Sequence, residues 1–84
     1  MFHVRAHIRI DGAEQAAEFV GKMNSDGTVN KYYIENEDGT NRVNARSLTG
    51  VIYASTEFAS NMYIVNDTVD GEFPTFINSY RVFS

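Results

Sequence analysis

The strongest constraint on the fold is an unbroken alternation of apolar and polar residues over positions 2–9. One side of this segment holds Phe2, Val4, Ala6 and Ile8, and the other holds His3, Arg5, His7 and Arg9. A period of two is typical of a β-strand with one buried and one solvent-exposed face. In a chain of 84 residues, which leaves room for a single hydrophobic core, this strand must join a sheet that is covered on one face.

A helix should follow this strand. Asp11 precedes Glu14 in the D-x-x-E arrangement of a helix N-terminus, and the pattern predicts a helix over residues 12–24 with Asp11 as its cap. Apolar residues then recur at helical spacing. The stripe that we expect to face the core is Ala13, Ala16, Ala17, Val20 and Met23.

The middle of the chain predicts three further strands and a second helix. Strands are expected over residues 28–36, 40–44 and 61–66, with a tight turn at 37–39. Ser47 is a typical N-cap for a short helix. The side chains expected to point inward from these elements are Tyr32, Ile34, Leu48, Val51, Ile52, Met62 and Ile64.

The last segment favours a helix but also has strand character. Phe73, Phe76, Ile77 and Tyr80 fit a helical stripe, and Pro74 suits a first helical turn. Residues 80–83 would equally suit a strand. We favour the helix.

The element order is therefore β-α-β-β-α-β with a final α. It predicts a single α+β domain over residues 1–84, in which helices cover one face of a four-stranded antiparallel sheet. The open face should carry Arg5, His7, Lys31, Tyr33, Tyr63 and Val65. Such a mixture can bind a partner or form a weak homodimer, although scattered tyrosines on an exposed sheet face are also normal.

Composition narrows the function classes. The net charge of −4 disfavours a general nucleic-acid binder, which needs clustered cations. The absence of cysteine removes disulfides and thiolate chemistry. His3 and His7 would lie about 13 Å apart on a strand and could not chelate one metal ion. We expect no metal and no cofactor. No apolar run suits a membrane span, so we expect a cytoplasmic protein.

Residues 43–51, which read V-N-A-R-S-L-T-G-V, resemble the signature around the regulatory serine of HPr, the histidine-containing phosphocarrier protein of the sugar phosphotransferase system. The resemblance implies an open-faced β-sandwich. It covers the element order over residues 2–67, and residues 43–51 carry its specificity. The C-terminal segment departs from the alanine-rich final helix of the family.

The phosphocarrier motif itself is missing. In the family the phosphorylated histidine follows the first strand within G-(I/L)-H-A-R-P-A, whereas residues 10–14 here read I-D-G-A-E. Asp11 takes the place of the histidine. A carboxylate could form an acyl phosphate or imitate a phosphorylated histidine, but capping and the helix dipole explain Asp11 more simply. His7 is the other alternative acceptor, although we place it on the exposed strand face.

Ser47 is the main functional candidate. The resemblance implies phosphorylation of the matching serine by HPr kinase/phosphorylase, after which the phosphoprotein acts as corepressor for a transcription regulator. A helix N-terminus and the adjacent Arg46 suit a phosphate. The competing interpretation is an unmodified capping serine. Leu48, Thr49 and Ile52 occupy positions where the family contacts its partners, and together with Arg46 they are the candidate partner-binding residues.

We therefore expect a non-catalytic, HPr-like regulatory or protein-interaction module that is not an enzyme and is switched at Ser47. Two alternatives stay open at this point. One is a phosphocarrier that uses Asp11 or His7 as its acceptor. The other is an orphan domain that ancestral partners no longer recognise.

Overall fold

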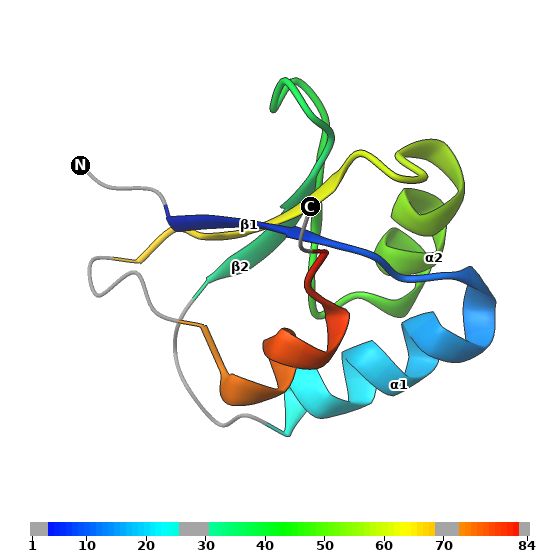
Figure 1. Ribbon diagram of the computed structural model, residues 1–84. Coiled ribbons are helices and arrows are strands. Elements are labelled where there is room, and N and C mark those ends of the chain that lie inside the picture. Colours follow the sequence, from blue (N-terminus) through cyan, green and yellow to red (C-terminus); the bar gives the residue numbers. More distant parts are fainter. Residues whose placement is uncertain (1–3, 26–30, 69–72, 83–84) are drawn as a thin grey trace.

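The computed structural model describes residues 4–25, 31–68 and 73–82. Its elements are β1 (Val4–Ile8), α1 (Gly12–Asn24), β2 (Tyr32–Glu35), β3 (Arg42–Asn44), α2 (Leu48–Glu57), β4 (Met62–Asn66) and the 3-10 helix η1 (Thr75–Tyr80) (Figure 1). The α+β class and the order of the first six elements agree with the sequence prediction, whereas the last element is a 3-10 helix and not the predicted α-helix. His3 and the beginning of the predicted strand at residues 28–30 lie outside the described residues.

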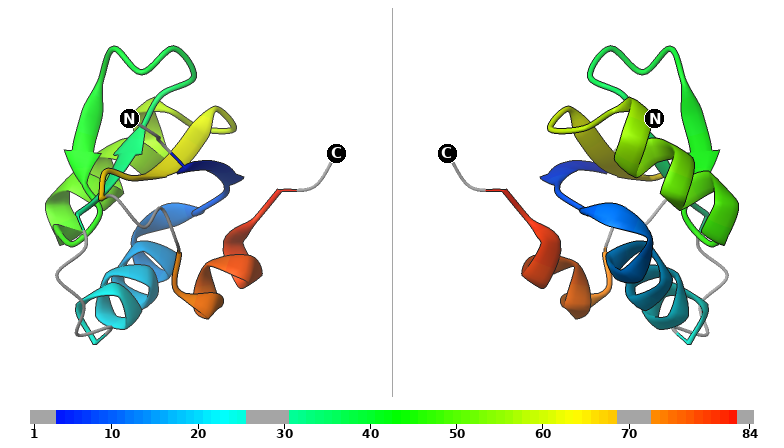
Figure 2. Two further views of the ribbon diagram at one scale, coloured as in Figure 1. Left: turned by 90° about the vertical axis from the view of Figure 1, so that its left-hand side faces the viewer. Right: turned by 90° about the vertical axis from the view of Figure 1, so that its right-hand side faces the viewer.

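The four strands form one antiparallel sheet in the order β1-β4-β2-β3. The last strand in sequence therefore lies between β1 and β2. In one row across the sheet, Ala6 lies opposite Ile64, and Ile64 lies opposite Ile34. All three side chains are buried, and this row faces the helices. Figure 2 shows α1 and α2 on the same side of the sheet.

The helices contribute a stripe that differs from the predicted one. Ala13 and Ala17 are exposed, while Phe19 is fully buried. The α1 residues that face the core are Ala16, Phe19, Val20 and Met23. Since Phe19 fills far more space than an alanine, its burial sets the rotation of α1. In α2, Val51 is buried as predicted, Ile52 is half-buried, and Leu48 is exposed.

The β2–β3 connection is wider than the predicted tight turn. The Asn36 amide donates to the Asn41 carbonyl at 3.1 Å, so residues 37–40 form the loop. Gly39 has a φ of 75°, a conformation that favours glycine. Asp38 Oδ1 accepts hydrogen bonds from the amide and hydroxyl of Thr40. The loop rises above the sheet, away from α1 (Figure 1).

The C-terminal segment combines both predicted tendencies. Residues 75–80 form η1, which buries Ile77 and Tyr80. The chain then becomes extended along the outer edge of β1. The Arg9 amide donates to the Tyr80 carbonyl at 2.8 Å, and the Val82 amide donates to the His7 carbonyl at 2.9 Å. Helix and strand character therefore apply to successive parts of one segment.

Candidate functional site

Ser47 is the N-cap of α2, as predicted. Its Oγ accepts a hydrogen bond from the Gly50 amide at 3.2 Å and lies 3.3 Å from Thr49 Oγ1. The side chain is half-buried. The first turn of α2 carries no acidic residue. The hydroxyl therefore lies at the positive end of a ten-residue helix, with no carboxylate in that turn to oppose an added negative charge.

The α2 N-terminus lies close to β3 because residue 50 is a glycine. A Cβ at Gly50 would lie only 3.2 Å from the Cβ of Val43 and 3.4 Å from Ser47 Oγ. A side chain at this position would push the first turn of α2 away from β3. Gly50 therefore fixes where the Ser47 hydroxyl lies relative to the sheet.

Arg46 joins the C-terminus of α1 to the start of α2. Its Nη1 donates to the Met23 carbonyl at 2.6 Å, and its guanidinium lies 5.6 Å from the centre of the Tyr32 ring. Asn24 Nδ2 donates to the Arg46 carbonyl at 3.3 Å. A guanidinium suits the last carbonyl groups of a helix, where the dipole is negative. This contact holds Arg46 Nη1 at the C-terminus of α1.

Leu48 and Tyr53 are the strongly exposed large hydrophobic side chains among the described residues, with 43% and 44% of their surface accessible. They follow Ser47 on α2, and Thr49 beside them is also exposed. Ile52 lies between them in sequence and packs against the edge of the core. Leu48, Thr49, Ile52 and Tyr53 form what we call the α2 surface.

Sequence reasoning missed Tyr53. Asn41 Nδ2 donates to its hydroxyl at 3.1 Å, which holds the ring beside the β2–β3 loop. The i, i+4 spacing of Thr49 and Tyr53 would have indicated that the two share a helix face.

Asp11 occupies the N-cap position of α1, but its side chain makes no capping hydrogen bond. Both carboxylate oxygens accept from Arg9 Nε instead, at 2.9 and 3.2 Å. The Asp11 amide donates to Gln15 Oε1 at 2.7 Å, so Gln15 takes the role predicted for Glu14. The prediction that Asp11 and Glu14 form the capping hydrogen bonds of this helix is therefore wrong. The physical reason is competition, because Arg9 offers the carboxylate a charged donor.

His7 does not lie beside the N-terminus of α1, where a phosphoryl acceptor was considered. Its ring stacks on Tyr63, with 4.8 Å between the ring centres, on the sheet face opposite the helices. Its Nε2 lies 2.6 Å from the Ser60 carbonyl oxygen. A carbonyl only accepts hydrogen bonds, so Nε2 carries the proton in this contact. The lone pair of that nitrogen is then not available for phosphoryl transfer.

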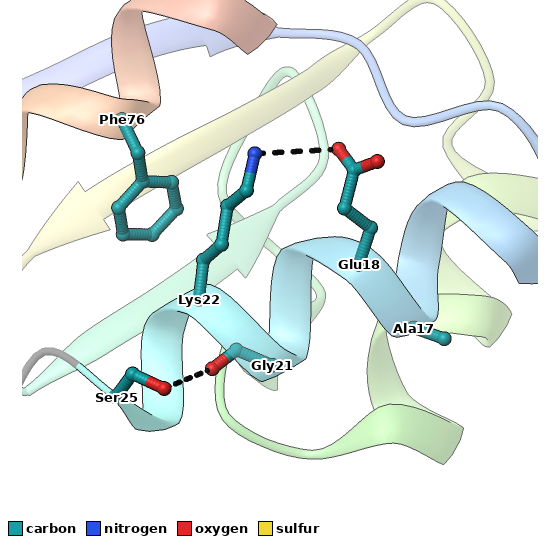
Figure 3. A pocket seen from close by; sticks show the side chains of 6 residues that line it. All are labelled: Ala17, Glu18, Gly21, Lys22, Ser25 and Phe76. Carbon is teal, nitrogen blue, oxygen red and sulfur yellow. Dashed lines mark hydrogen bonds and ion pairs between the residues drawn. The ribbon is translucent and has the colours of Figure 1, made fainter.

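A shallow hollow of about 650 Å³ lies between α1 and η1. Figure 3 shows the side chains that line it. It is lined by Ala17, Glu18, Gly21, Lys22, Ser25 and Phe76. Lys22 Nζ lies 3.5 Å from Glu18 Oε1, and the Tyr80 hydroxyl donates to the same oxygen at 2.5 Å. These charged and polar groups satisfy one another and connect η1 to α1.

The Tyr80–Glu18 contact changes the acidity of both groups. Burial, followed by the hydrogen bond to Glu18, raises the pKa of Tyr80 far above its ordinary value of 10.0. The hydrogen bond from Tyr80, followed by the charge of Lys22, lowers the pKa of Glu18. Both shifts favour the pair as it stands, a neutral phenol donating to a carboxylate.

Neither a metal site nor a membrane span emerges from the described ranges 4–25, 31–68 and 73–82. In that part of the chain, no group of three His, Asp or Glu side chains is arranged to bind a metal ion. None of its helices combines the length and apolar character that a membrane crossing needs.

Comparisons of the chain with family models, with curated proteins and with solved structures find no match.

Proposed function

We propose that this chain is a non-catalytic, HPr-like module of the phosphotransferase-system family, which regulates protein partners through its α2 surface and is switched by phosphorylation of Ser47. One observation carries the proposal. The Ser47 hydroxyl lies at the N-terminus of α2, directly before the exposed Leu48 and on the helix that also carries the exposed Tyr53. A modification at this hydroxyl would alter the border of an apolar surface, which is how such a switch controls docking.

The chemistry of the switch follows from the helix terminus. A phosphate on Oγ adds a charge of about −1.5 to −2 at pH 7 and three acceptor oxygens. The first-turn N–H groups of α2 and the helix dipole favour that charge. The partner surface that suits the phosphorylated form combines an apolar patch for Leu48 with an arginine cluster for the phosphate.

The fold supports the same assignment. An antiparallel sheet with both α-helices on one face is what the resemblance to HPr implies. The short η1 and the extended residues 81–82 depart from the family and lie at β1 and α1 rather than at α2. The proposal implies a cytoplasmic protein whose partners are proteins such as HPr kinase/phosphorylase or a transcription regulator.

The geometry gives less support to a phosphocarrier. Asp11 already accepts two hydrogen bonds from Arg9. Acyl-phosphate formation would have to break this pairing. His7 has one ring nitrogen engaged with Ser60 and lies on the other sheet face from α1.

Two phosphorylation assays read by mass spectrometry test the proposal. With HPr kinase/phosphorylase and ATP, we expect one phosphate on Ser47. This label should be absent from Ser47→Ala. It should be unchanged in Thr49→Ala, the matched control two residues further along the chain. With enzyme I and phosphoenolpyruvate, we expect no acid-labile phosphate.

The outcomes separate the alternatives. Acid-labile label from phosphoenolpyruvate, lost in Asp11→Asn or His7→Gln, would establish a carrier and refute the regulatory proposal. The absence of label in both assays would refute the Ser47 switch and leave an orphan domain.

A further inference from the structure

Among the described residues, the strongly exposed large hydrophobic side chains lie on α2 and not on the open face of the sheet. Val65 was expected to be exposed on that face, yet only 1% of its surface is accessible, because longer neighbouring side chains cover it. Arg5 lies 4.0 Å from the centre of the Tyr63 ring. Arg42 lies 4.6 Å from the centre of the Tyr33 ring. The two guanidiniums therefore cover the rings that a partner would have to contact.

The charges of the open face also balance one another. Glu35 lies between the two arginines, 3.7 Å from Arg5 Nε and 2.7 Å from Arg42 Nη2. Asp67 lies 3.6 Å from Arg42 Nη1. This group of two guanidiniums and two carboxylates has no net charge, so the sheet face offers no strong electrostatic attraction to a partner.

The α2 surface, in contrast, continues into a hollow that is rich in carboxylates. Thr49, Tyr53 and Glu57 follow one another at i, i+4 spacing and therefore share one face of α2. The Tyr53 ring packs edge-on against the Phe58 ring, with 6.0 Å between the ring centres. Beyond it lies a hollow of about 200 Å³, which we call the acidic hollow. It is lined by Asn36, Glu37, Asp38, Glu57, Phe58 and Asn61.

The three carboxylates of the acidic hollow are exposed and lack a cationic partner. Across residues 4–25, 31–68 and 73–82, neither Glu37, Asp38 nor Glu57 forms an ion pair. Arg5 reaches the same loop, but its Nη2 donates to backbone carbonyl groups there and its Nε faces Glu35. The acidic hollow therefore keeps a negative charge that the open face of the sheet does not have.

Two features maintain this negative charge. Hydrogen bonds from the Thr40 hydroxyl and then from the Thr40 amide lower the pKa of Asp38, so this carboxyl is ionised at neutral pH. Glu57 lies in the last turn of α2, which contains no basic residue. Since the C-terminal end of a helix carries partial negative charge, a carboxylate at this position is unfavourable for the folded chain. A cation supplied from outside would relieve the repulsion.

We propose that the α2 surface and the acidic hollow together bind a basic amphipathic helix of a partner protein. The apolar face of that helix packs over Leu48, Ile52 and Tyr53, and lysine or arginine side chains near one of its ends reach the carboxylates of the acidic hollow. The inference rests on the α2 surface of the proposed function and names the class of its partner. A phosphate on Ser47 would add negative charge at the other end of this surface and strengthen the binding of such a helix.

A helix suits this surface because of its shape and length. The exposed side chains follow the axis of α2 from Leu48 to Glu57, and a helix of ten residues spans about 15 Å. The side-chain ridges of one helix pack into the grooves of another over such a contact. An anionic membrane or a nucleic acid suits it less, because the carboxylates of the acidic hollow would repel either of them.

NMR titration of the isotope-labelled, unphosphorylated chain tests the inference. The probe is a model peptide of about 18 residues, long enough to be helical by itself, with leucine on one face and lysine and alanine elsewhere. Two control peptides replace its lysines by glutamate or its leucines by alanine. We expect only the leucine–lysine peptide to shift backbone amide resonances of α2 and of residues 36–41. About 1 M salt, where the Debye length is about 3 Å, should weaken its binding several-fold.

Glu57→Gln and Glu14→Gln are matched variants, since each removes one exposed carboxylate from a helix. Glu57→Gln should weaken the leucine–lysine peptide about threefold, as expected for an exposed ion pair, whereas Glu14→Gln should leave its affinity unchanged. Glu37→Gln combined with Glu57→Gln should weaken it about tenfold. The Tm of Glu57→Gln should equal or exceed that of the native chain, because the repulsion at the end of α2 is removed. A purely structural role of Glu57 would instead lower Tm.

Leu48→Ala tests the apolar half of the contact. It should weaken the leucine–lysine peptide about fivefold, because apolar surface that the peptide would bury is lost. Leu48→Met, which keeps a flexible apolar side chain, should retain most of the affinity.

Several results would overturn the inference. They are no shifts with the leucine–lysine peptide at millimolar concentration, equal binding of the glutamate peptide, and tighter binding of vesicles that contain phosphatidylserine. Shifts of α2 resonances that grow with the concentration of the chain alone would show that a second copy occupies the surface. The Ser47 phosphorylation assays use no peptide and the titration uses no kinase, so the failure of one test can be told from the failure of the other.

Discussion

Ile77 provides the sharpest test of how the C-terminal segment contributes to stability. It lies in the six-residue η1, and 1% of its surface is accessible. Its side chain belongs to the same buried cluster as residues of α1, α2 and the sheet. If η1 is an integral part of the domain, truncation of Ile77 should destabilise the whole chain and not just this segment.

The expected loss can be worked out from burial. Shortening a buried isoleucine to alanine costs about 2–5 kcal/mol, and about 3 kcal/mol is a central value. For a domain of 60–100 residues, each kcal/mol lowers Tm by about 4–8 °C. Ile77→Ala should therefore lower Tm by about 15 °C. Since small domains unfold with about 5–15 kcal/mol, the variant should still be folded at room temperature.

Thermal and urea unfolding followed by circular dichroism measure this loss. The matched control is Asn78→Ala, which alters the exposed neighbour in the same turn and should change Tm by no more than a few degrees. If Ile77→Ala and Asn78→Ala unfolded at the same temperature, η1 would fray independently of the core and the reasoning would fail.

Three further predictions concern the helices and their contacts. Ser47→Ala removes the bond to the first turn of α2 and should cost about 1 kcal/mol in urea unfolding, whereas the exposed Thr49→Ala should cost clearly less. Tyr80→Phe removes the hydrogen bond that lowers the pKa of Glu18, so its deficit in Tm should be present above pH 4.5, the ordinary pKa of that carboxyl, and shrink as the pH falls below it. The raised pKa of Tyr80 also makes the native chain lose stability above pH 10.0, a loss that Tyr80→Phe should lack. If the difference in Tm between the native chain and Tyr80→Phe did not change with pH, both statements would be contradicted. Gly21→Ala, in the exposed interior of α1 with nothing within 4 Å of the new Cβ, should stabilise the chain by about 0.5–1 kcal/mol, and a lower Tm would show that the hollow beside Phe76 needs the glycine.

The order of elements could be predicted because each element has its own local period. The alternation over residues 2–9 and the helical spacing after Asp11 each involve neighbours along the chain, and both give the right element. The N-cap role of Ser47 was also predictable, since its partner Gly50 is only three residues away. The C-terminal segment was ambiguous because its first half packs as a helix and its second half pairs with β1.

The candidate site was predictable in position but not in its contacts. Periodicity placed Ser47 and Leu48 at the start of α2 but put Leu48 inside, whereas Gly50 and Val43 set how α2 lies on β3 and leave Leu48 exposed. Arg46 adjoins Ser47 in sequence, yet its guanidinium binds the carbonyl of Met23. A long side chain reaches whichever acceptor the fold brings near it, and that acceptor need not be a neighbour in sequence.

By itself, the sequence determined the order of strands and helices as far as β4, that one sheet face is buried, and that no histidine stands in residues 10–14. The tertiary structure decided which strands pair, how α1 is rotated around Phe19, and how Arg5, Glu35 and Arg42 meet over Val65. The physical reason is the range of the interactions. Hydrophobic periods and caps act between residues a few positions apart, whereas these contacts join strands that are brought together only when β4 inserts between β1 and β2.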